Sequence, residues 1–180
     1  MSDPRYFAFL RAINTGTRRL TNDALLEPFH DLGFTDIAAY QAAGNVTFRC
    51  GDPDQVAESR IEEALGGVYG FATPTFVRTA DEIAAIASAA PFGADELAAS
   101  DGKTQVAFLR SVPSSAAIAQ VTALVPAEDR AVLSGREWYW LPVAGVGRST
   151  LPVAEITRLL GDMTIRTLGT VERMANKFPD

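Results

Sequence analysis

Hydrophobic side chains recur along this chain with two different periods. Short segments alternate apolar and polar positions, which predicts strands, and longer segments repeat them every three to four residues, which predicts amphipathic helices. Strands are predicted at residues 5–11, 36–40, 45–50, 73–78, 104–110, 129–133, 136–141 and 164–167. Helices are predicted at residues 21–32, from 52–54 to 65, and at 80–89, 114–124, 151–160 and 169–177.

Turn-forming residues separate these segments. Gly44 predicts a tight connection between two strands, and Ser134-Gly135 predicts a hairpin. The segments 66–70 and 91–102 are predicted to be a turn and a loop. Pro74 indicates an edge strand or the start of one.

The elements follow the order strand, helix, strand, strand, helix, strand, and this order occurs twice. It is the order of the split βαβ unit, and the segments YFAFLR (6–11) and VAFLR (106–110) echo one another. The sequence therefore predicts an α+β fold of two ferredoxin-like (split βαβ) repeats, with mainly antiparallel sheets packed by helices. Residues 1–90 are assigned to the first repeat with a linking helix, and 91–180 to the second with a C-terminal helix. An α/β sandwich without duplication is the alternative.

Four segments carry a resemblance to a known family. They are RAINTGTRRL (11–20), QAAGNVTF (41–48), VRTADEIAAI (77–86) with APF (90–92), and GVGRSTL (145–151). In this order the chain resembles, from Arg5 to Lys177, the bacterial family catalogued as domain of unknown function 1697. The resemblance implies two ferredoxin-like repeats, and it implies no reaction, cofactor or substrate.

The chain departs from the family pattern in three places. Ala12 stands where members usually have Gly, and Thr150 where they usually have Lys. Thr167-Leu168 replaces the usual Asn-Trp pair. The last two departures bear on any ligand contact that members make from the C-terminal end.

Composition narrows the classes of function. The net charge is −6, which disfavours nonspecific binding to a phosphate backbone. A single cysteine excludes an internal disulfide, and a single histidine predicts no His-rich metal site. No apolar run reaches the roughly 20 residues that cross a bilayer, and the N-terminus does not have the pattern of a signal peptide. We expect a cytoplasmic protein without a metal, cofactor or membrane partner.

The topology of the first repeat predicts a site for an anion. The loop after the first strand and the turn between the second and third strands lie at the same end of such a sheet. They carry guanidinium groups, amides and glycine N–H groups that suit a phosphate or carboxylate: Arg11, Asn14, Gly16, Arg18, Gln41, Gly44 and Asn45. The alternative is a structural network, in which Asn and Gly shape turns and Arg11 pairs with a carboxylate such as Asp23.

A second candidate is the Gly-rich segment 143–150, which precedes a predicted helix. Gly147, Arg148 and Ser149 could hold an anion at the helix N-terminus. The segment lacks the Gly-Lys-Ser/Thr signature of a P-loop. Alternatively, Ser149 or Thr150 is simply the N-cap of the helix.

Other chemically distinctive residues are expected to be structural. His30 is predicted to be exposed on a helix, and Cys50 to be a small buried side chain. The aromatic run Trp138, Tyr139 and Trp140 favours core packing or a partner contact over a stacking platform for a base.

Three functions follow from these residues. The first is binding of a small anionic metabolite or nucleotide, with or without catalysis, through the loops of the first repeat. The second is a non-enzymatic interaction or oligomerisation module, with a homodimer as its simplest form. The third, nucleic-acid binding, is disfavoured because the predicted strands lack the aromatic pattern of RNA-binding sheets. The sequence assigns no reaction.

Overall fold

The computed structural model describes residues 3–13, 19–41 and 43–180. Its strands are β1 (Arg5–Leu10), β2 (Thr35–Ala39), β3 (Asn45–Arg49), β4 (Thr75–Thr79), β5 (Gln105–Leu109), β6 (Arg130–Ser134), β7 (Glu137–Leu141) and β8 (Met163–Thr167). Its helices are α1 (Asn22–Asp31), the 3-10 turn η1 (Pro53–Val56), α2 (Glu58–Tyr69), α3 (Ala80–Ala87), α4 (Ala94–Ala98), α5 (Ser115–Leu124), α6 (Val153–Leu160) and α7 (Leu168–Lys177).

The chain divides into two compact units. Unit 1 consists of residues 1–85 together with 174–180, and unit 2 consists of residues 86–173. The C-terminal residues therefore return to the unit in which the chain begins.

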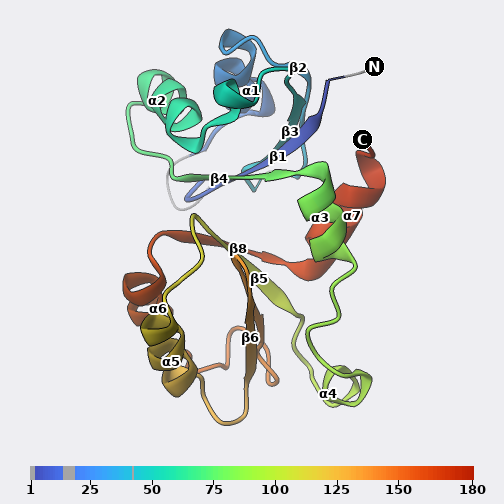
Figure 1. Ribbon diagram of the computed structural model, residues 1–180, viewed down its shortest axis with the longest axis vertical. Coiled ribbons are helices and arrows are strands. Elements are labelled where there is room, and N and C mark those ends of the chain that lie inside the picture. The colour runs from blue at the N-terminus through green and yellow to red at the C-terminus, as the bar shows by residue number, and fades with distance from the viewer. Residues whose placement is uncertain (1–2, 14–18, 42) are drawn as a thin grey trace. The chain divides into compact units, whose positions relative to one another are not determined.

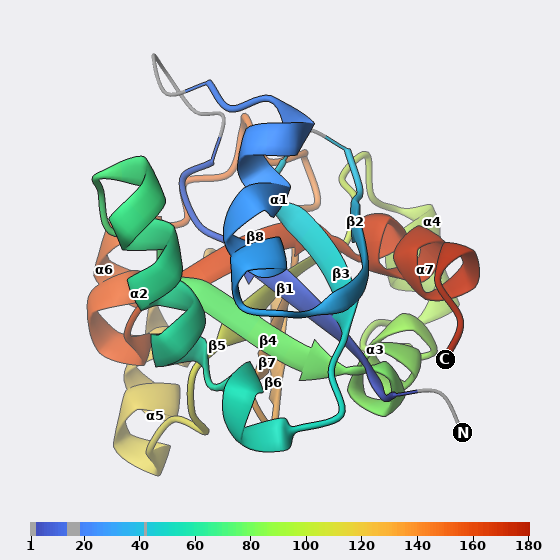
Figure 2. The same cartoon turned by 90° about the horizontal axis from the view of Figure 1, so that it is seen from above.

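Unit 1 is built on an antiparallel sheet of order β2-β3-β1-β4. Helices α1 and α2 cover one face of this sheet (Figures 1 and 2). Because side chains alternate along a strand, Tyr6, Ala8 and Leu10 of β1 point to the helices. Both faces of β1 are buried, so its residues are apolar without interruption from Tyr6 to Leu10.

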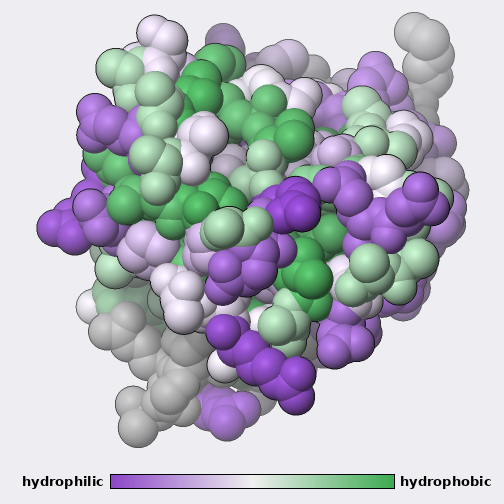
Figure 3. All heavy atoms as spheres, turned by 90° about the horizontal axis from the view of Figure 1, so that it is seen from below, coloured by the Kyte–Doolittle hydropathy of each residue, from purple (hydrophilic) through white to green (hydrophobic). Residues whose placement is uncertain are grey.

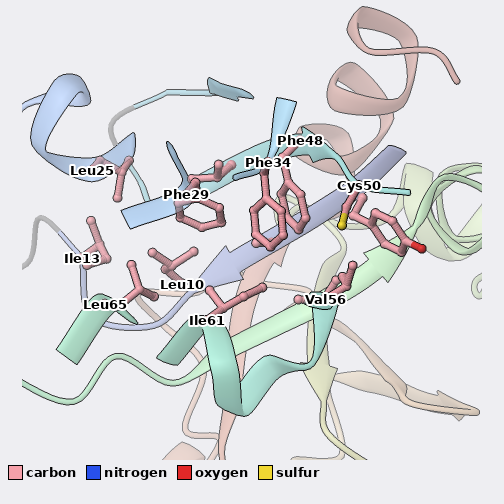
Figure 4. Close-up of a cluster of buried hydrophobic side chains, with 14 residues drawn as sticks. Leu10, Ile13, Leu25, Phe29, Phe34, Phe48, Cys50, Val56, Ile61 and Leu65 are labelled. Atoms are coloured by element: carbon pink, nitrogen blue, oxygen red, sulfur yellow. The ribbon is translucent and has the colours of Figure 1, made fainter. Parts of the chain in front are cut away.

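Aromatic rings fill the core of unit 1 between α1 and the sheet (Figure 4). The rings of Phe34 and Phe48 stack with centroids 4.3 Å apart, and Phe29 of α1 lies tilted against Phe48 at 5.5 Å. Ile61 and Leu65 of α2 are fully buried in the same cluster. These side chains fix the position of both helices on the sheet.

Unit 2 repeats this design with a sheet of order β6-β7-β5-β8. Helices α5 and α6 lie together on one face of it (Figure 1). Ala107 and Leu109 of β5, Trp138 and Trp140 of β7, and Ile156 of α6 form its core.

The central strands β1 and β5 pair with their neighbours in the same register. Leu10 pairs with Thr75 in unit 1, and Leu109 pairs with Met163 at the same point in unit 2. Phe7 pairs with Arg78, as Val106 pairs with Arg166. The predicted α+β fold of two ferredoxin-like repeats is therefore confirmed.

Helix α1 begins after Thr21, which caps it by accepting from the Ala24 N–H at 3.2 Å, and it runs through Pro28. Two local predictions are confirmed. The hairpin turns at Ser134-Gly135, where Gly135 has a φ of 59°. Pro74 directly precedes β4, which is an edge strand.

Other local predictions are wrong. The helix predicted from 52–54 to 65 is divided at Ala57 into η1 and α2. The segment 66–70 was predicted as a turn, but α2 continues through its glycines to Tyr69. The reason is tertiary, because the Tyr69 hydroxyl donates to the Leu25 carbonyl at 2.9 Å and its ring stacks on Phe71. The predicted loop 91–102 contains the short helix α4, whose first turn is closed by the Glu96 carboxylate accepting from the Gly93 N–H at 2.9 Å.

No helix among the described residues is both long and apolar enough to span a membrane.

Candidate functional site

The predicted site of the first repeat lies where β1 ends. The Leu10 N–H donates to the Gly44 carbonyl at 2.7 Å, and the Tyr40 N–H donates to the Asn45 carbonyl at 2.8 Å. Arg11 therefore leaves β1 beside the turn that joins β2 to β3. This contact brings the start of the first loop and the second loop to the same end of the sheet, as the topology predicts.

The backbone at this end of the sheet is unusual. Ala12 and Gln41 have φ values of 59° and 56°, and Gly44 has a φ of 70°. A Cβ atom at Gly44 would lie 3.0 Å from both the Leu10 carbonyl oxygen and the Ile13 Cβ. Gly44 is therefore required by both conformation and space, whereas Ala12 and Gln41 hold a left-handed conformation that side chains disfavour.

The predicted residues of this site differ in their surroundings. Asn45 is fully buried, and its side-chain amide donates to the Tyr40 carbonyl at 3.1 Å. Its amide N–H thus closes the turn, which is the structural role that the sequence offered as the alternative. Gln41 is exposed and Arg11 is half-buried. Asn14, Gly16 and Arg18 lie outside the described residues.

The Gly-rich segment 143–150 folds as successive turns. Gly145, with a φ of 91°, donates to the Pro142 carbonyl at 2.7 Å and accepts from the N–H groups of Arg148 and Ser149. Helix α6 begins only at Val153, so the alternative that Ser149 or Thr150 is its N-cap is wrong. The Ser149 hydroxyl instead accepts from the Leu151 N–H at 3.1 Å and donates to Asp129.

Asp129 organises this segment and was not singled out from the sequence. It is only 4% exposed, and its carboxylate accepts from the Trp140 indole N–H at 2.9 Å and from the Val143 N–H at 3.1 Å. Together with the Ser149 hydroxyl, these two N–H groups give the Asp129 carboxylate three hydrogen-bond donors. An anion role for Gly147, Arg148 and Ser149 stays a prediction, and the charge of Asp129 disfavours an anion beside the Ser149 hydroxyl.

A cluster of ionic groups lies at the other end of β1. Arg5 is bonded to the Asp36 carboxylate and donates to Thr47 Oγ1 at 3.1 Å. Arg49 reaches Asp36 at 3.4 Å and Asp180 at 3.1 Å. Hydrogen bonding from Arg5, together with its charge and that of Arg49, lowers the pKa of Asp36 below its ordinary value. The cluster ties the C-terminus to unit 1.

The aromatic run of β7 belongs to the interior. Trp138, Tyr139 and Trp140 are 3%, 4% and 3% exposed, so the run does not form a surface platform for bases. Burial, with the nearby Glu137 charge, raises the pKa of Tyr139 to about 12. Cys50 is buried and His30 is exposed, both as predicted.

Exposed apolar side chains are spread over separate elements. The large ones among the described residues are Val68, Leu97, Val112, Val132, Val146 and Val153. On the face drawn in Figure 3, green hydrophobic patches are interrupted by purple hydrophilic side chains. Single exposed apolar residues are normal on protein surfaces, so this pattern does not define an interaction surface. The same described residues contain no group of three His, Cys, Asp or Glu able to hold a metal ion.

Comparison with known proteins identifies the family. The family model described as protein of unknown function DUF1697 matches residues 4–139, which is more than half of the chain. The chain belongs to the DUF1697 family. The match covers the N-terminal part of unit 1 and extends into unit 2 as far as β7.

This DUF1697 protein is also similar to a solved structure. The conserved bacterial protein SP0830 from Streptococcus pneumoniae aligns with a TM-score of 0.78 at 17% identity, covering 98% of this chain and 99% of that chain. At this identity the likeness shows the shared fold. Among curated proteins, none matches the chain.

Proposed function

We propose that this DUF1697 protein binds a small anionic metabolite or nucleotide at the end of the unit 1 sheet, where Arg11 meets the turn between β2 and β3. The observation that carries the proposal is the bond from the Leu10 N–H to the Gly44 carbonyl, because it fixes Arg11 beside that turn. Arg11 and the exposed Gln41 then lie at the same end of one sheet.

The backbone of this end supports an anion ligand. Three residues in left-handed conformation, Ala12, Gln41 and Gly44, lie in the two connections at this end of the sheet. Left-handed residues in turns orient successive N–H groups to one side, which forms concavities that bind anions. Strained residues of this kind cluster at ligand sites, where they orient groups for binding. An arginine fork adds charge and two parallel hydrogen bonds to a phosphate or carboxylate.

The test is a calorimetric titration of the full chain with inorganic phosphate, pyrophosphate, ATP and citrate. The decisive variant is Arg11→Ala. Its matched control is Arg60→Ala, which removes the same charge from the exposed surface of α2 in the same unit. We expect at least one anion to bind, with an affinity lowered about tenfold or more by Arg11→Ala, since hydrogen bonds to charged groups contribute about 1.5–3 kcal/mol.

The control should bind as tightly as the wild type. Equal binding by the wild type and Arg11→Ala, or equal losses in both arginine variants, would show that no anion site exists at this turn. A search in which no anion binds the wild type would also reject the proposal.

A further inference from the structure

Unit 2 contains an open cavity of about 290 Å³ between α5 and the β6–β7 hairpin. This volume is at the lower end of the roughly 300–1,000 Å³ that ligand pockets occupy, which suits a small molecule. Most of its lining is apolar, with Asp129, Arg130 and Thr122 as the polar exceptions. The lining residues are Ile118, Val121, Thr122, Val125, Pro126, Ala127, Asp129, Arg130, Ala131, Leu133, Trp138 and Leu160.

Comparison with unit 1 shows which helical side chain is replaced at this cavity. Helices α1 and α5 are both ten residues long and begin after a capping residue, Thr21 or Ser114, that accepts from the N–H three residues on. Counting from these caps places Thr122 at the position of Phe29. Phe29 is fully buried in the core of unit 1, whereas Thr122 lines the cavity.

The strand register identifies a second replacement. Thr35 pairs with Arg49 in unit 1, and Arg130 pairs with Leu141 at the equivalent place in unit 2. These places are equivalent because Phe48 and Trp140, which precede Arg49 and Leu141, pair with the equivalent residues Tyr6 and Gln105 of the central strands. The residues before Thr35 and Arg130, which are Phe34 and Asp129, therefore correspond to one another.

The two replacements exchange an aromatic stack for a polar contact. Phe34 stacks on Phe48 at 4.3 Å, while Asp129 accepts from the Trp140 indole N–H at 2.9 Å. The connection between helix and strand is also longer in unit 2, where it spans residues 125–129 rather than 32–34. Without the two phenyl rings, the space that forms the aromatic core of unit 1 (Figure 4) stays open in unit 2.

Asp129 gives this cavity a negative charge without a matching cation. Its three donors, Trp140, Val143 and Ser149, are all neutral. Among the described residues no Lys, Arg or His lies within ion-pair distance of its carboxylate. A carboxylate accepts about four hydrogen bonds, so one acceptor position remains. Buried charges are usually paired, and an ammonium group would supply both the charge and the missing donor.

The other charged group at the cavity does not fill this role. The Arg130 guanidinium bonds to Glu96 at 3.2 Å and to the backbone carbonyls of Ala127, Glu128 and Asp129. These bonds hold it against the connection between α5 and β6. Trp138, in contrast, lines the cavity and offers an aromatic surface that attracts cations.

We propose that the cavity of unit 2 binds a small organic ammonium ion, with its apolar body against α5 and Trp138 and its ammonium group on Asp129. This site is distinct from the anion site proposed in unit 1, and each can fail without the other.

Tryptophan fluorescence reports on ligand binding in this cavity, because both tryptophans of the chain are close to it. Trp138 lines the cavity, and the Trp140 indole N–H donates to the Asp129 carboxylate. The probe is 2-phenylethylammonium, and its neutral comparison is 2-phenylethanol, which has the same body. We expect 2-phenylethylammonium to produce a saturable change in the fluorescence emission of the wild type. It should bind about tenfold more tightly than the alcohol, because a charge-assisted hydrogen bond provides a ratio of affinities of this size.

Three variants separate the contributions. Thr122→Phe restores the ring found in unit 1 and should abolish binding without loss of folding. Gln120→Phe adds the same ring to α5 at an exposed position that does not line the cavity, and it should bind normally. Asp129→Asn keeps an acceptor for Trp140 and should reduce the preference for the ammonium ion to less than about twofold.

The proposal is overturned if the wild type gives no saturable change with 2-phenylethylammonium, or if the alcohol binds equally well. It is also overturned if Thr122→Phe and Gln120→Phe weaken binding equally, because the cavity would then not be the site. Thr122→Phe tests the location even if the Asp129 variant does not fold.

Discussion

Units 1 and 2 share one strand order and the register of their central strands but differ in what lies between the first helix and the sheet. Unit 1 places Phe29 and Phe34 there, both nearly or fully buried. Unit 2 places Thr122 and Asp129 at the equivalent positions and has a cavity of about 290 Å³. The backbone pattern of this repeat therefore does not depend on a filled aromatic core at that point.

Other features are the same in both units. The fourth strands β4 and β8 each contain a buried or half-buried arginine followed by threonine, Arg78-Thr79 and Arg166-Thr167. Each arginine donates to the carbonyl of its preceding residue at 2.8 Å. Thr79 and Thr167 each accept from the N–H three residues later, at the start of α3 and α7. These shared contacts maintain the end of the repeat, whereas the helix-to-strand junction has diverged.

The outer edge of β4 is closed by carboxylates. The outward N–H groups of Thr75, Val77 and Thr79 donate to glutamates at 2.7, 2.9 and 2.8 Å. The acceptors are Glu62 and Glu58 of α2 and Glu82 of α3. For β8, no described residue accepts from the outward N–H of Ile165. Covering an edge in this way blocks pairing with another chain, so the two units differ in how they protect their edges.

The largest expected effect is loss of the aromatic core in unit 1. Phe29→Ala should lower the free energy of unfolding by about 3–5 kcal/mol, since it leaves a cavity among close-packed rings. The equivalent Thr122→Ala should change it by less than about 0.5 kcal/mol, because Thr122 is exposed. Urea titrations followed by circular dichroism measure both. Equal losses would mean that the two junctions are packed alike.

The next effect concerns the hydrogen bonds that replace the aromatic stack in unit 2. Asp129→Ala leaves the Trp140 and Val143 N–H groups without their acceptor, which should cost about 2–4 kcal/mol. Asp129→Asn retains an oxygen acceptor and should cost less. Tryptophan fluorescence during urea unfolding reports this unit specifically. An alanine variant as stable as the wild type would show that these bonds do not replace the stack energetically.

A smaller effect is expected at the β4 edge. Glu62→Ala removes the acceptor of the Thr75 N–H and should destabilise unit 1 by about 1–2 kcal/mol. Glu63→Ala is the matched control, because Glu63 is exposed on the same helix and should change the unfolding free energy by less than about 0.5 kcal/mol. Chemical denaturation compares the two, and similar values would indicate that the carboxylate adds no stability to this edge.

The smallest effect is the pH dependence of the Asp36 contact. β2 has one more residue than β6 between equivalent paired positions, and this segment carries Asp36 beside Arg5. Since folding lowers the pKa of Asp36, its contribution is present above the ordinary value of 3.8 and is lost as the pH falls through the lower folded value.

Because the Asp36 side chain is 59% exposed, this contribution should stay below about 1 kcal/mol. Asp36→Asn should reduce the loss of stability in acid by that amount, as measured by urea titrations above and below this pH range. An unchanged acid profile in Asp36→Asn would show that the ion pair does not stabilise unit 1.

Part of the candidate sites could be predicted from the sequence. The alternation of apolar residues and the order of elements predict two repeats, and the topology of a repeat predicts that Arg11 lies beside the Gly44 turn. The sequence did not single out Asp129. Counting outward from YFAFLR and VAFLR places Leu133 opposite Phe34, because the connections of the two repeats differ in length, so only the strand pairing shows that Asp129 corresponds to Phe34.

Much of the local structure follows from the sequence, because caps such as Thr21 and Ser114, turns such as Ser134-Gly135 and the alternation within strands depend on nearby residues. Where distant residues meet depends on the folded arrangement of the elements. Tyr69 extends α2 through two glycines because its hydroxyl reaches Leu25. Asp129 is buried because Trp140, Val143 and Ser149 satisfy it. Such contacts join residues far apart in the chain, and their energies outweigh local preferences only once the fold has formed.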